Sequence, residues 1–286
     1  MAGLLLCVST TRMTSTSLTA QTLSHVGLVR EENQDTARAD LAGVGAPSAP
    51  HGSLLAIADG MGGYAKGGVA SATAIETFFA AFYSEPAGAR AQSLRRAVEQ
   101  ANLAVHQAAF RLNAGQMGTT LTVANIAGDE LYLAHVGDSR AYLVRDGQAR
   151  CLTNDHSLVG ELVRMRVLSP DKVRTHSQRS VLNRCLGLNL FVQPDVNRFP
   201  VQAGDVIILC TDGLWAYVED AEFAGLAAEI PEVPALSQRL IDLALARQTD
   251  DNASVVVARI EQVGAPVAQA APSGWRRLAA VFDWLF

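Results

Sequence analysis

Three short apolar runs, each ending next to an aspartate, constrain this 286-residue chain more than any other feature. The runs cover residues 54–58, 131–136 and 206–210. Asp59 follows the first run directly, and Asp138 and Asp212 each follow theirs after one residue. A fourth aspartate, Asp251, stands shortly before an apolar run that begins at residue 254. Buried strands carry their ends to a common rim, so the pattern predicts carboxylates that converge on hard cations above an apolar core.

The order of the predicted elements favours an α+β fold. Between residues 119 and 152, runs at 120–126, 130–136, 140–145 and 148–152 alternate with turn signals, which predicts a β-meander. Helical periodicity precedes it at 69–83, where Val69, Ala72, Phe79 and Phe82 are placed for packing, and at 94–112. A strand at 206–210, a helix at 236–246 and a last strand at 254–260 follow. Strands and helices are thus grouped rather than strictly alternating, which indicates antiparallel sheets covered by helices.

Composition excludes several classes of protein. The net charge of −5 comes with scattered Lys and Arg, so we expect no nucleic-acid partner. The four cysteines lack paired spacing and the six histidines form no HxH or HExxH arrangement, so an ordinary zinc site is not expected. Unpaired cysteines fit a reducing, cytoplasmic setting. No apolar stretch reaches the length of a membrane-spanning helix.

Four segments are predicted along the chain. Residues 1–20 are expected to be a loose lead-in, 21–262 the main domain, 263–274 a flexible linker rich in Ala, Pro, Gln and Ser, and 275–286 an apolar helix. In the last segment Trp275, Leu278 and Phe282 fall near one helical face. That face could dock on the chain's own domain or contact a membrane surface or a partner, and the sequence leaves these alternatives open.

The acidic residues point to phosphate-ester hydrolysis. Ligand sets made only of oxygen select Mg²⁺ or Mn²⁺, and two such ions can clamp an in-line displacement at phosphorus. Glycine directly after Asp59 lets the backbone come close, so the Gly60 carbonyl can serve as a further ligand. A phosphoryl group also needs a cation, and Arg30, which opens a dense polar segment, is the candidate.

Several ordered motifs resemble the bacterial metal-dependent protein serine/threonine phosphatases of the PPM type, class 2C. The motifs are VGLVR with Asn33 and Asp35, ADGMGG at 58–63, GTT at 118–120, VGDSRAY at 136–142, LTNDHS at 152–157, TDGL at 211–214, and Asp251-Asn252. Together they span about residues 23–260, and their order makes the resemblance specific. It implies a four-layer αββα sandwich, with two antiparallel sheets flanked by helices.

The resemblance also implies roles for the acidic residues. Asp59 would bridge two Mn²⁺ or Mg²⁺ ions that hold a hydroxide nucleophile, and the Gly60 carbonyl would bind the second ion. Asp212 and Asp251 would bind the first ion. Asp138, with Asp212, would hold a third, weaker ion.

Two further residues of the resemblance are assigned to the substrate and the water. Arg30 would bind the phosphate, and Asp35 would orient metal-bound water. The substrates would be phosphorylated proteins, the opposing enzyme a Hanks-type kinase, and the chain a monomer. The family's flap corresponds to residues 157–188, whose arginines could meet phosphopeptides or simply be solvated. These are Arg164, Arg166, Arg174, Arg179 and Arg184.

Two departures from the family pattern stand out. Met61 occupies a position where some members carry a histidine thought to protonate the leaving alkoxide, and Met cannot donate a proton. A metal-bound water could replace that histidine. The usual bacterial pattern also has a glutamate in the segment that holds residues 66–69 here, so a role for that carboxylate is in doubt.

Three alternative functions compete with this interpretation. A nucleotide-binding loop is disfavoured because Lys66 precedes Gly67 instead of following the glycines. A cysteine-nucleophile phosphatase is excluded because no cysteine has an arginine six positions later. A catalytically inactive relative that binds phosphoproteins as a regulatory module remains the alternative, although such a module needs no cluster of carboxylates.

Overall fold

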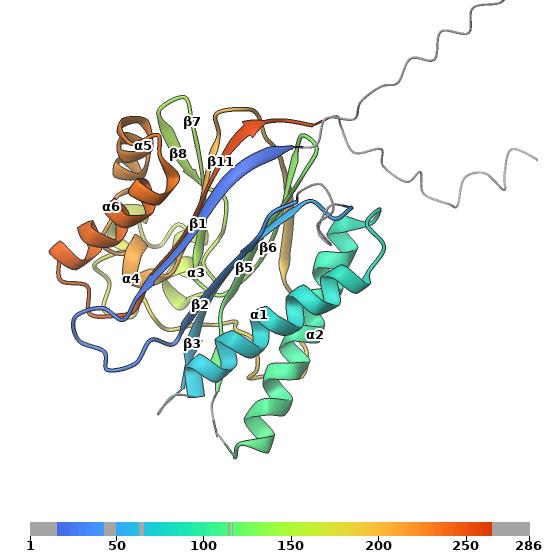
Figure 1. Cartoon of the computed structure of the whole chain (residues 1–286). Coiled ribbons are helices and arrows are strands. Elements are labelled where there is room, and N and C mark those ends of the chain that lie inside the picture. Colours follow the sequence, from blue (N-terminus) through green and yellow to red (C-terminus); the bar gives the residue numbers. More distant parts are fainter. Residues whose placement is uncertain (1–15, 43–49, 63–65, 114, 116, 265–286) are drawn as a thin grey trace, which may run out of the picture.

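The computed structural model of the chain describes residues 16–42, 50–62, 66–113, 115 and 117–264, which form two antiparallel sheets (Figure 1). One sheet has the strand order β1-β11-β10-β7-β8 and the other β2-β3-β5-β6-β9, with β4 paired to the end of β3. The strands are β1 (Ser17–His25), β2 (Asp35–Asp40), β3 (Ser53–Met61), β4 (Gly118–Thr119), β5 (Leu121–Ala127), β6 (Glu130–Val136), β7 (Arg140–Arg145), β8 (Gln148–Cys151), β9 (Asp195–Pro200), β10 (Val206–Cys210) and β11 (Ala253–Gln262).

Helices cover the outer face of each sheet, which confirms the four-layer αββα sandwich (Figure 1). The helices are α1 (Lys66–Ser84), α2 (Arg90–Arg111), α3 (Leu158–Arg164), α4 (Asp212–Trp215), α5 (Asp220–Glu229), α6 (Val233–Ala246) and the 3₁₀ turn η1 (Pro170–Lys172). Three apolar cores separate the layers: Phe78 lies in the core under α1 and α2, Trp215 in the core under α5 and α6, and Leu209 between the sheets. Burial of such side chains contributes about 1.5–3 kcal/mol each.

The packing face of α1 differs in part from the prediction. Phe79 and Phe82 are buried as expected, but Val69 is 42% exposed and Phe78 is fully buried. The buried stripe follows the 3.6-residue period through residues 70, 74, 75, 78, 79 and 82, so Val69 falls on the solvent side. α1 also begins three residues earlier than predicted, at Lys66.

The predicted β-meander is split between the two sheets. β5 pairs with β6 in one sheet, and β7 pairs with β8 in the other. The chain therefore crosses between sheets at residues 137–139, which carry Asp138. A turn signal shows where a strand ends, but it does not show whether the next strand joins the same sheet, so this part of the prediction was wrong.

The predicted lead-in of residues 1–20 is too long. β1 begins at Ser17, and Leu18 through Ala20 pair with β11 between Ile260 and Ala258. β1 is an edge strand, half-buried along most of its length, and its polar sequence gives only a weak apolar signal. The strand is therefore hard to detect from its composition.

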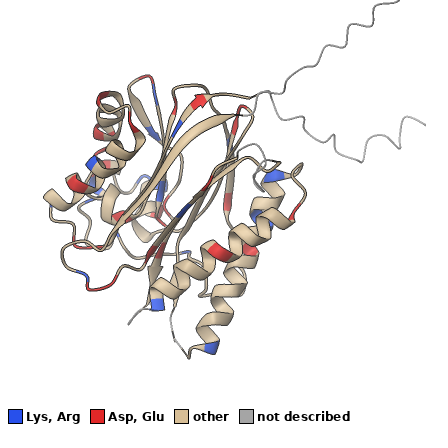
Figure 2. Cartoon of the chain, in the orientation of Figure 1, with Lys and Arg blue, Asp and Glu red and all other residues tan. Residues whose placement is uncertain are grey.

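The ends of the chain and its charges complete the description. The linker predicted at 263–274 and the helix predicted at 275–286 lie, from residue 265 onward, outside the described residues. None of the described helices is both long and apolar enough to cross a bilayer. Acidic and basic residues occur on both helical layers (Figure 2).

Candidate metal centre

A cavity of about 1030 Å³ brings together the sequence-predicted site residues except Asp35, which is not part of its wall. Its wall includes all four aspartates, Asp59, Asp138, Asp212 and Asp251, and also Arg30. Gly60, Met61 and three flap residues complete much of the wall. Residues separated by more than two hundred positions in the sequence thus face one space.

Each aspartate reaches the cavity from a different element. Asp59 lies inside β3, near its end, and Asp212 opens the short helix α4 one residue after β10. Asp251 stands two residues before β11, and Asp138 lies in the crossover between β6 and β7. β3 belongs to one sheet while β10 and β11 belong to the other, so the cavity spans both sheets.

Asp35 lies opposite Asp59 across the β2–β3 pair. Its Oδ2 accepts hydrogen bonds from Thr211 Oγ1 at 2.9 Å and from Ser254 Oγ at 2.6 Å. Its Oδ1 is buried and has no hydrogen-bond partner in the described protein. The Asp35 carboxylate is therefore fixed through Oδ2, and Oδ1 remains available to accept a further hydrogen bond.

The carboxylates raise one another's pKa. Burial, and then the charges of Asp35 and Asp212, raise the pKa of Asp59 well above its usual value. Burial, followed by the charge of Asp212, does the same for the pKa of Asp138. Burial raises the pKa of Asp35 to about 7, against hydrogen bonds that lower it, and the pKa of Asp212 to about 6, with the Asp251 charge adding to the shift. A cation among these carboxylates would stabilise their charged forms.

The donor set fits hard divalent cations. Asp35 Oδ1 and Asp212 Oδ1 are both buried without a partner, and an unpaired buried carboxylate oxygen is costly unless a cation or donor meets it. Among the described residues, no three His, Cys, Asp or Glu side chains are arranged to hold one ion by themselves. Hard divalent ions such as Mg²⁺ bind through carboxylate oxygens and keep several waters, so oxygens of this kind suit them.

Two threonines fix the position of Asp59. Thr120 Oγ1 accepts a hydrogen bond from the Asp59 amide at 2.8 Å, and the Thr120 amide donates to the Asp59 carbonyl at 2.9 Å. Thr119 Oγ1 donates to the same carbonyl at 2.8 Å. The sequence pattern did not single out these residues for a role, although they stand in the GTT motif.

Gly60 has no room for a side chain. A Cβ at this position would lie 2.0 Å from the Gly67 carbonyl oxygen and 2.6 Å from that of Gln34. The Gly60 amide also donates to the Gln34 carbonyl at 3.2 Å. The glycine is therefore required by the close approach of β3 to the start of α1.

Arg30 lies at the rim with its guanidinium against the Asp250–Asp251 segment. Its Nη2 is 2.8 Å from Asp251 Oδ2, and its Nε donates to the Asp250 carbonyl at 3.3 Å. The side chain is 55% exposed, so the pair stands at the open edge of the cavity.

Asn252 ties the loop that carries Arg30 to this edge. Its Nδ2 donates to the carbonyls of Val26 and Glu32, and its Oδ1 accepts from the Gln34 amide. The sequence motif included Asn252 but did not suggest this role.

Most flap arginines with described contacts are engaged inside the protein. Arg174 donates to the Trp215 and Val218 carbonyls and pairs with Asp220, and Arg184 pairs with Asp195. Arg164 donates to the Asp155 carbonyl. Arg179 alone of the four approaches the cavity edge, with its Nη2 3.6 Å from Asp250 Oδ1. The picture of freely solvated arginines is therefore wrong for Arg174, whose side chain is only 14% exposed.

Comparison with known proteins identifies similar chains. The family model described as protein phosphatase 2C matches residues 30–247. The serine/threonine protein phosphatase PstP of Mycobacterium tuberculosis is 40% identical over 235 residues, which cover 82% of this chain and 43% of that protein. The chain therefore spans less than half the length of that relative. The serine/threonine phosphatase stp of Listeria welshimeri is 32% identical over 209 residues, covering 71% of this chain and 83% of its own.

Solved structures give the same result. The crystal structure of the M. tuberculosis serine/threonine phosphatase PstP/Ppp matches with a TM-score of 0.76 and 38% identity over 86% of this chain and 99% of that one. The catalytic domain of PstP in complex with two manganese ions matches with a TM-score of 0.75 and 35% identity over 87% of this chain and 100% of that one.

Proposed function

Because the chain belongs to the protein phosphatase 2C family, we propose that it hydrolyses phosphoserine and phosphothreonine in proteins with divalent metal ions as cofactors. The observation that carries the proposal is the convergence of Asp59, Asp138, Asp212 and Asp251 with Arg30 on one cavity. The manganese ions of the PstP structure support Mn²⁺ as the metal.

The proposed ligands are those that the family resemblance implies, and the presence of these residues in the cavity wall supports them. Asp59 would bridge two ions, with the Gly60 carbonyl on one and Asp212 and Asp251 on the other. Asp138 would contribute to a third. When bound, such ions act as Lewis acids that polarise water and the phosphoryl oxygens.

Arg30 would bind the phosphate. Its guanidinium offers a planar fork for two phosphoryl oxygens, and at the rim it now satisfies Asp251 instead. If Asp251 holds a divalent ion, its carboxylate would no longer be available to Arg30, and the guanidinium would be free for the substrate. Arg30 would then link metal binding to phosphate binding.

Asp35 would orient the attacking water. Its Oδ2 is fixed by Thr211 and Ser254, while Oδ1 has no protein partner and can accept a hydrogen bond from water.

Water is the proposed proton donor to the leaving alkoxide. Met61 lies in the cavity wall, and none of the described residues in that wall is a histidine. The exposed mouth of the cavity, edged by Arg30, gives water access. This part of the reaction therefore needs no protein acid at Met61.

The partners and location complete the proposal. Phosphoproteins are the proposed substrate class, which the names of the similar proteins support. A Hanks-type kinase would be the opposing enzyme. We propose a monomer in the cytoplasm, and Cys151, Cys185 and Cys210 are all free thiols, which suits a reducing compartment. Residues 275–286 are proposed to contact a membrane surface or a partner.

Hydrolysis of p-nitrophenyl phosphate and of a phosphothreonine peptide tests the proposal. We expect turnover by the full chain that requires Mn²⁺ or Mg²⁺, disappears with EDTA and is nearly abolished in Asp212→Asn. A folded chain without metal-dependent turnover would refute it and leave the inactive phosphoprotein-binding module as the better account.

A further inference from the structure

The segment that leads into the flap runs alongside the segment that carries Asp138. The Leu152 amide donates to the Ala141 carbonyl at 2.7 Å, and the His156 amide donates to the Gly137 carbonyl at 2.7 Å. The Gly137 amide donates in turn to His156 Nδ1 at 3.2 Å. Residues 152–156 are thus hydrogen-bonded along both sides of Asp138.

A buried ion pair joins the same two segments. Arg140 donates from Nε and Nη2 to the two carboxylate oxygens of Asp155 at 3.0 and 2.7 Å, and the side chains are only 11% and 7% exposed. The Arg140 guanidinium lies 3.6 Å from the ring centroid of Trp215. An ion pair with two charge-assisted hydrogen bonds, whose guanidinium also stacks on an aromatic ring, has little freedom to move.

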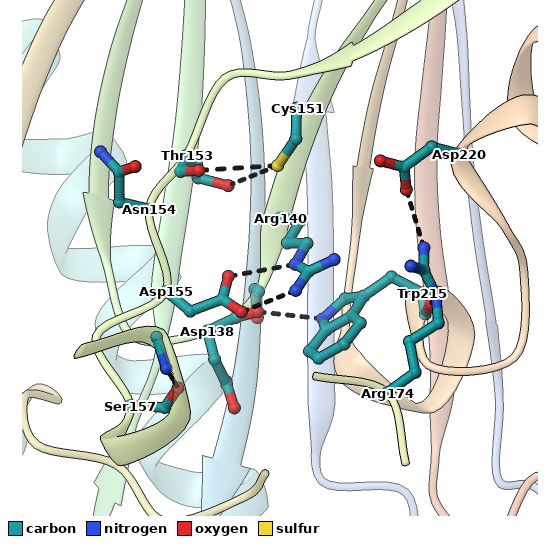
Figure 3. Close-up of polar contacts among 12 residues, drawn as sticks. Asp138, Arg140, Cys151, Thr153, Asn154, Asp155, Ser157, Arg174, Trp215 and Asp220 are labelled. Atoms are coloured by element: carbon teal, nitrogen blue, oxygen red, sulfur yellow. Dashed lines mark hydrogen bonds and ion pairs between the residues drawn. The ribbon is translucent and has the colours of Figure 1, made fainter. Parts of the chain in front are cut away.

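Trp215 connects this pair directly to Asp138. Its Nε1 donates to the Asp138 main-chain carbonyl at 3.0 Å, and the Asp138 carboxylate points away from the Arg140–Asp155 pair (Figure 3). That carboxylate lines the metal cavity. The indole therefore anchors the backbone whose side chain reaches the cavity.

Asp155 also holds the first helix of the flap. Arg164, near the end of α3, donates to the Asp155 carbonyl at 3.0 Å, and the Gly160 amide donates to the capping Ser157 Oγ at 3.1 Å. A Cβ at Gly160 would lie 2.3 Å from the Asp155 carbonyl oxygen, so α3 and Asp155 are in direct backbone contact. A displacement of α3 would therefore also displace the backbone of Asp155.

We propose that Arg140, Asp155 and Trp215 are positioning residues that couple the order of the flap to metal binding at Asp138. None of the three lines the metal cavity, but together they fix the backbone of Asp138 and the start of the flap through one network. Substrate that orders the flap would then tighten the metal at Asp138, and metal at Asp138 would order the flap. This inference rests on the proposed function.

Manganese calorimetry and hydrogen exchange of residues 157–164 test the coupling in the full chain. Asp155→Asn keeps the shape but removes the charge, and Trp215→Phe removes only the N–H donor and part of the ring. We expect both variants to bind the weakest Mn²⁺ about 10- to 100-fold less tightly and to exchange faster in α3. Added Mn²⁺ should slow exchange in α3 in the wild type and have a smaller effect in the variants.

Asp205→Asn is the matched control, because Asp205 forms a bidentate pair with Arg145 at the other end of the same strand, β7. It should unfold more easily yet bind Mn²⁺ like the wild type. Unchanged Mn²⁺ affinity in folded Trp215→Phe, or equal weakening in Asp205→Asn, would overturn the inference. Absence of metal-dependent turnover in the wild type would refute the proposed function instead. The two outcomes are distinguishable because neither calorimetry nor hydrogen exchange depends on catalysis.

Discussion

Asp212→Asn should stabilise the metal-free protein and destabilise the metal-bound one, relative to the wild type. Without metal, Asp212 carries a charge next to Asp59 and Asp251, and its Oδ1 is buried without a partner. Asparagine keeps the size of the side chain and removes the charge. The cost of burying that charge, and its repulsion by Asp251, are then removed in the metal-free protein.

The pKa of Asp212 sets the size of this effect. A rise from 3.8 to about 6 corresponds to roughly 3 kcal/mol of unfavourable free energy when the carboxylate is ionised. Because the side chain faces a cavity open to water, we expect a gain of about 1–3 kcal/mol in the free energy of unfolding near neutral pH.

The pH dependence has a definite sign. Below about pH 4 the folded and unfolded states both keep the proton, and the penalty is absent. Between 3.8 and about 6 the unfolded state loses its proton first, so the stability of the metal-free wild type falls as pH rises. Asp35, with a pKa of about 7, extends this fall toward neutrality. The Asp212→Asn variant should show a shallower fall.

Manganese should reverse the order of stability. An ion that binds only the folded state adds about 2.7 kcal/mol at a hundredfold excess over its dissociation constant, and Asp212→Asn should lose most of that gain. Urea unfolding followed by circular dichroism, in EDTA and in Mn²⁺, measures both effects.

Asp205→Asn is the control for this comparison as well. It should be less stable in both conditions, by about 1–3 kcal/mol, because it breaks a pair with Arg145. If Asp212→Asn is less stable than the wild type in EDTA, the picture of crowded, repelling carboxylates is wrong.

Three further predictions concern the rim and the backbone around the cavity. Arg30→Ala should raise the KM for p-nitrophenyl phosphate more than it lowers kcat, as steady-state kinetics would show; a pure loss of kcat would contradict its role in binding phosphate. Gly60→Ala should lower the melting temperature sharply because its Cβ meets the Gly67 carbonyl at 2.0 Å, and an unchanged melting curve would argue against that contact. Asn252→Ala should cost about 1–3 kcal/mol in urea unfolding and mimic the kinetic defect of Arg30→Ala, since it frees the loop; normal kinetics would separate the two.

Continuous apolar runs made several strands predictable from the sequence. β6, β7 and β10 have the predicted bounds, because each is buried along nearly its whole length. β9 (Asp195–Pro200) and β1 were missed because both are edge strands with exposed or half-buried side chains. A local sequence pattern reveals a strand through its buried apolar residues, and an edge strand such as β1 or β9 has few of these.

The assignment of strands to sheets was not readable from the sequence. It depends on contacts between residues far apart in the chain, such as Ser17 with Gln262, and no local pattern encodes these. The split of the predicted meander at Asp138 is the clearest case.

The candidate site was predicted well in its acidic residues and less well in their supports. Four aspartates line one cavity, as predicted: Asp59, Asp138, Asp212 and Asp251. They could be found from the sequence because aspartate is a residue type that binds hard cations and each one stands near the end of a predicted strand. Thr120, Trp215 and Asn252 act through side-chain hydrogen bonds to backbone atoms, and a threonine, tryptophan or asparagine in a sequence carries no sign of such a partner.

The placement of the cavity across both sheets has a consequence for how the chain matures. Asp59 arrives on one half of the sandwich and Asp212 and Asp251 on the other, so neither half alone assembles a competent centre. Under the proposed function, a nascent chain would stay inert until β11, the last strand in the described part of the chain, has docked. Catalytic turnover would then report that both sheets have come together.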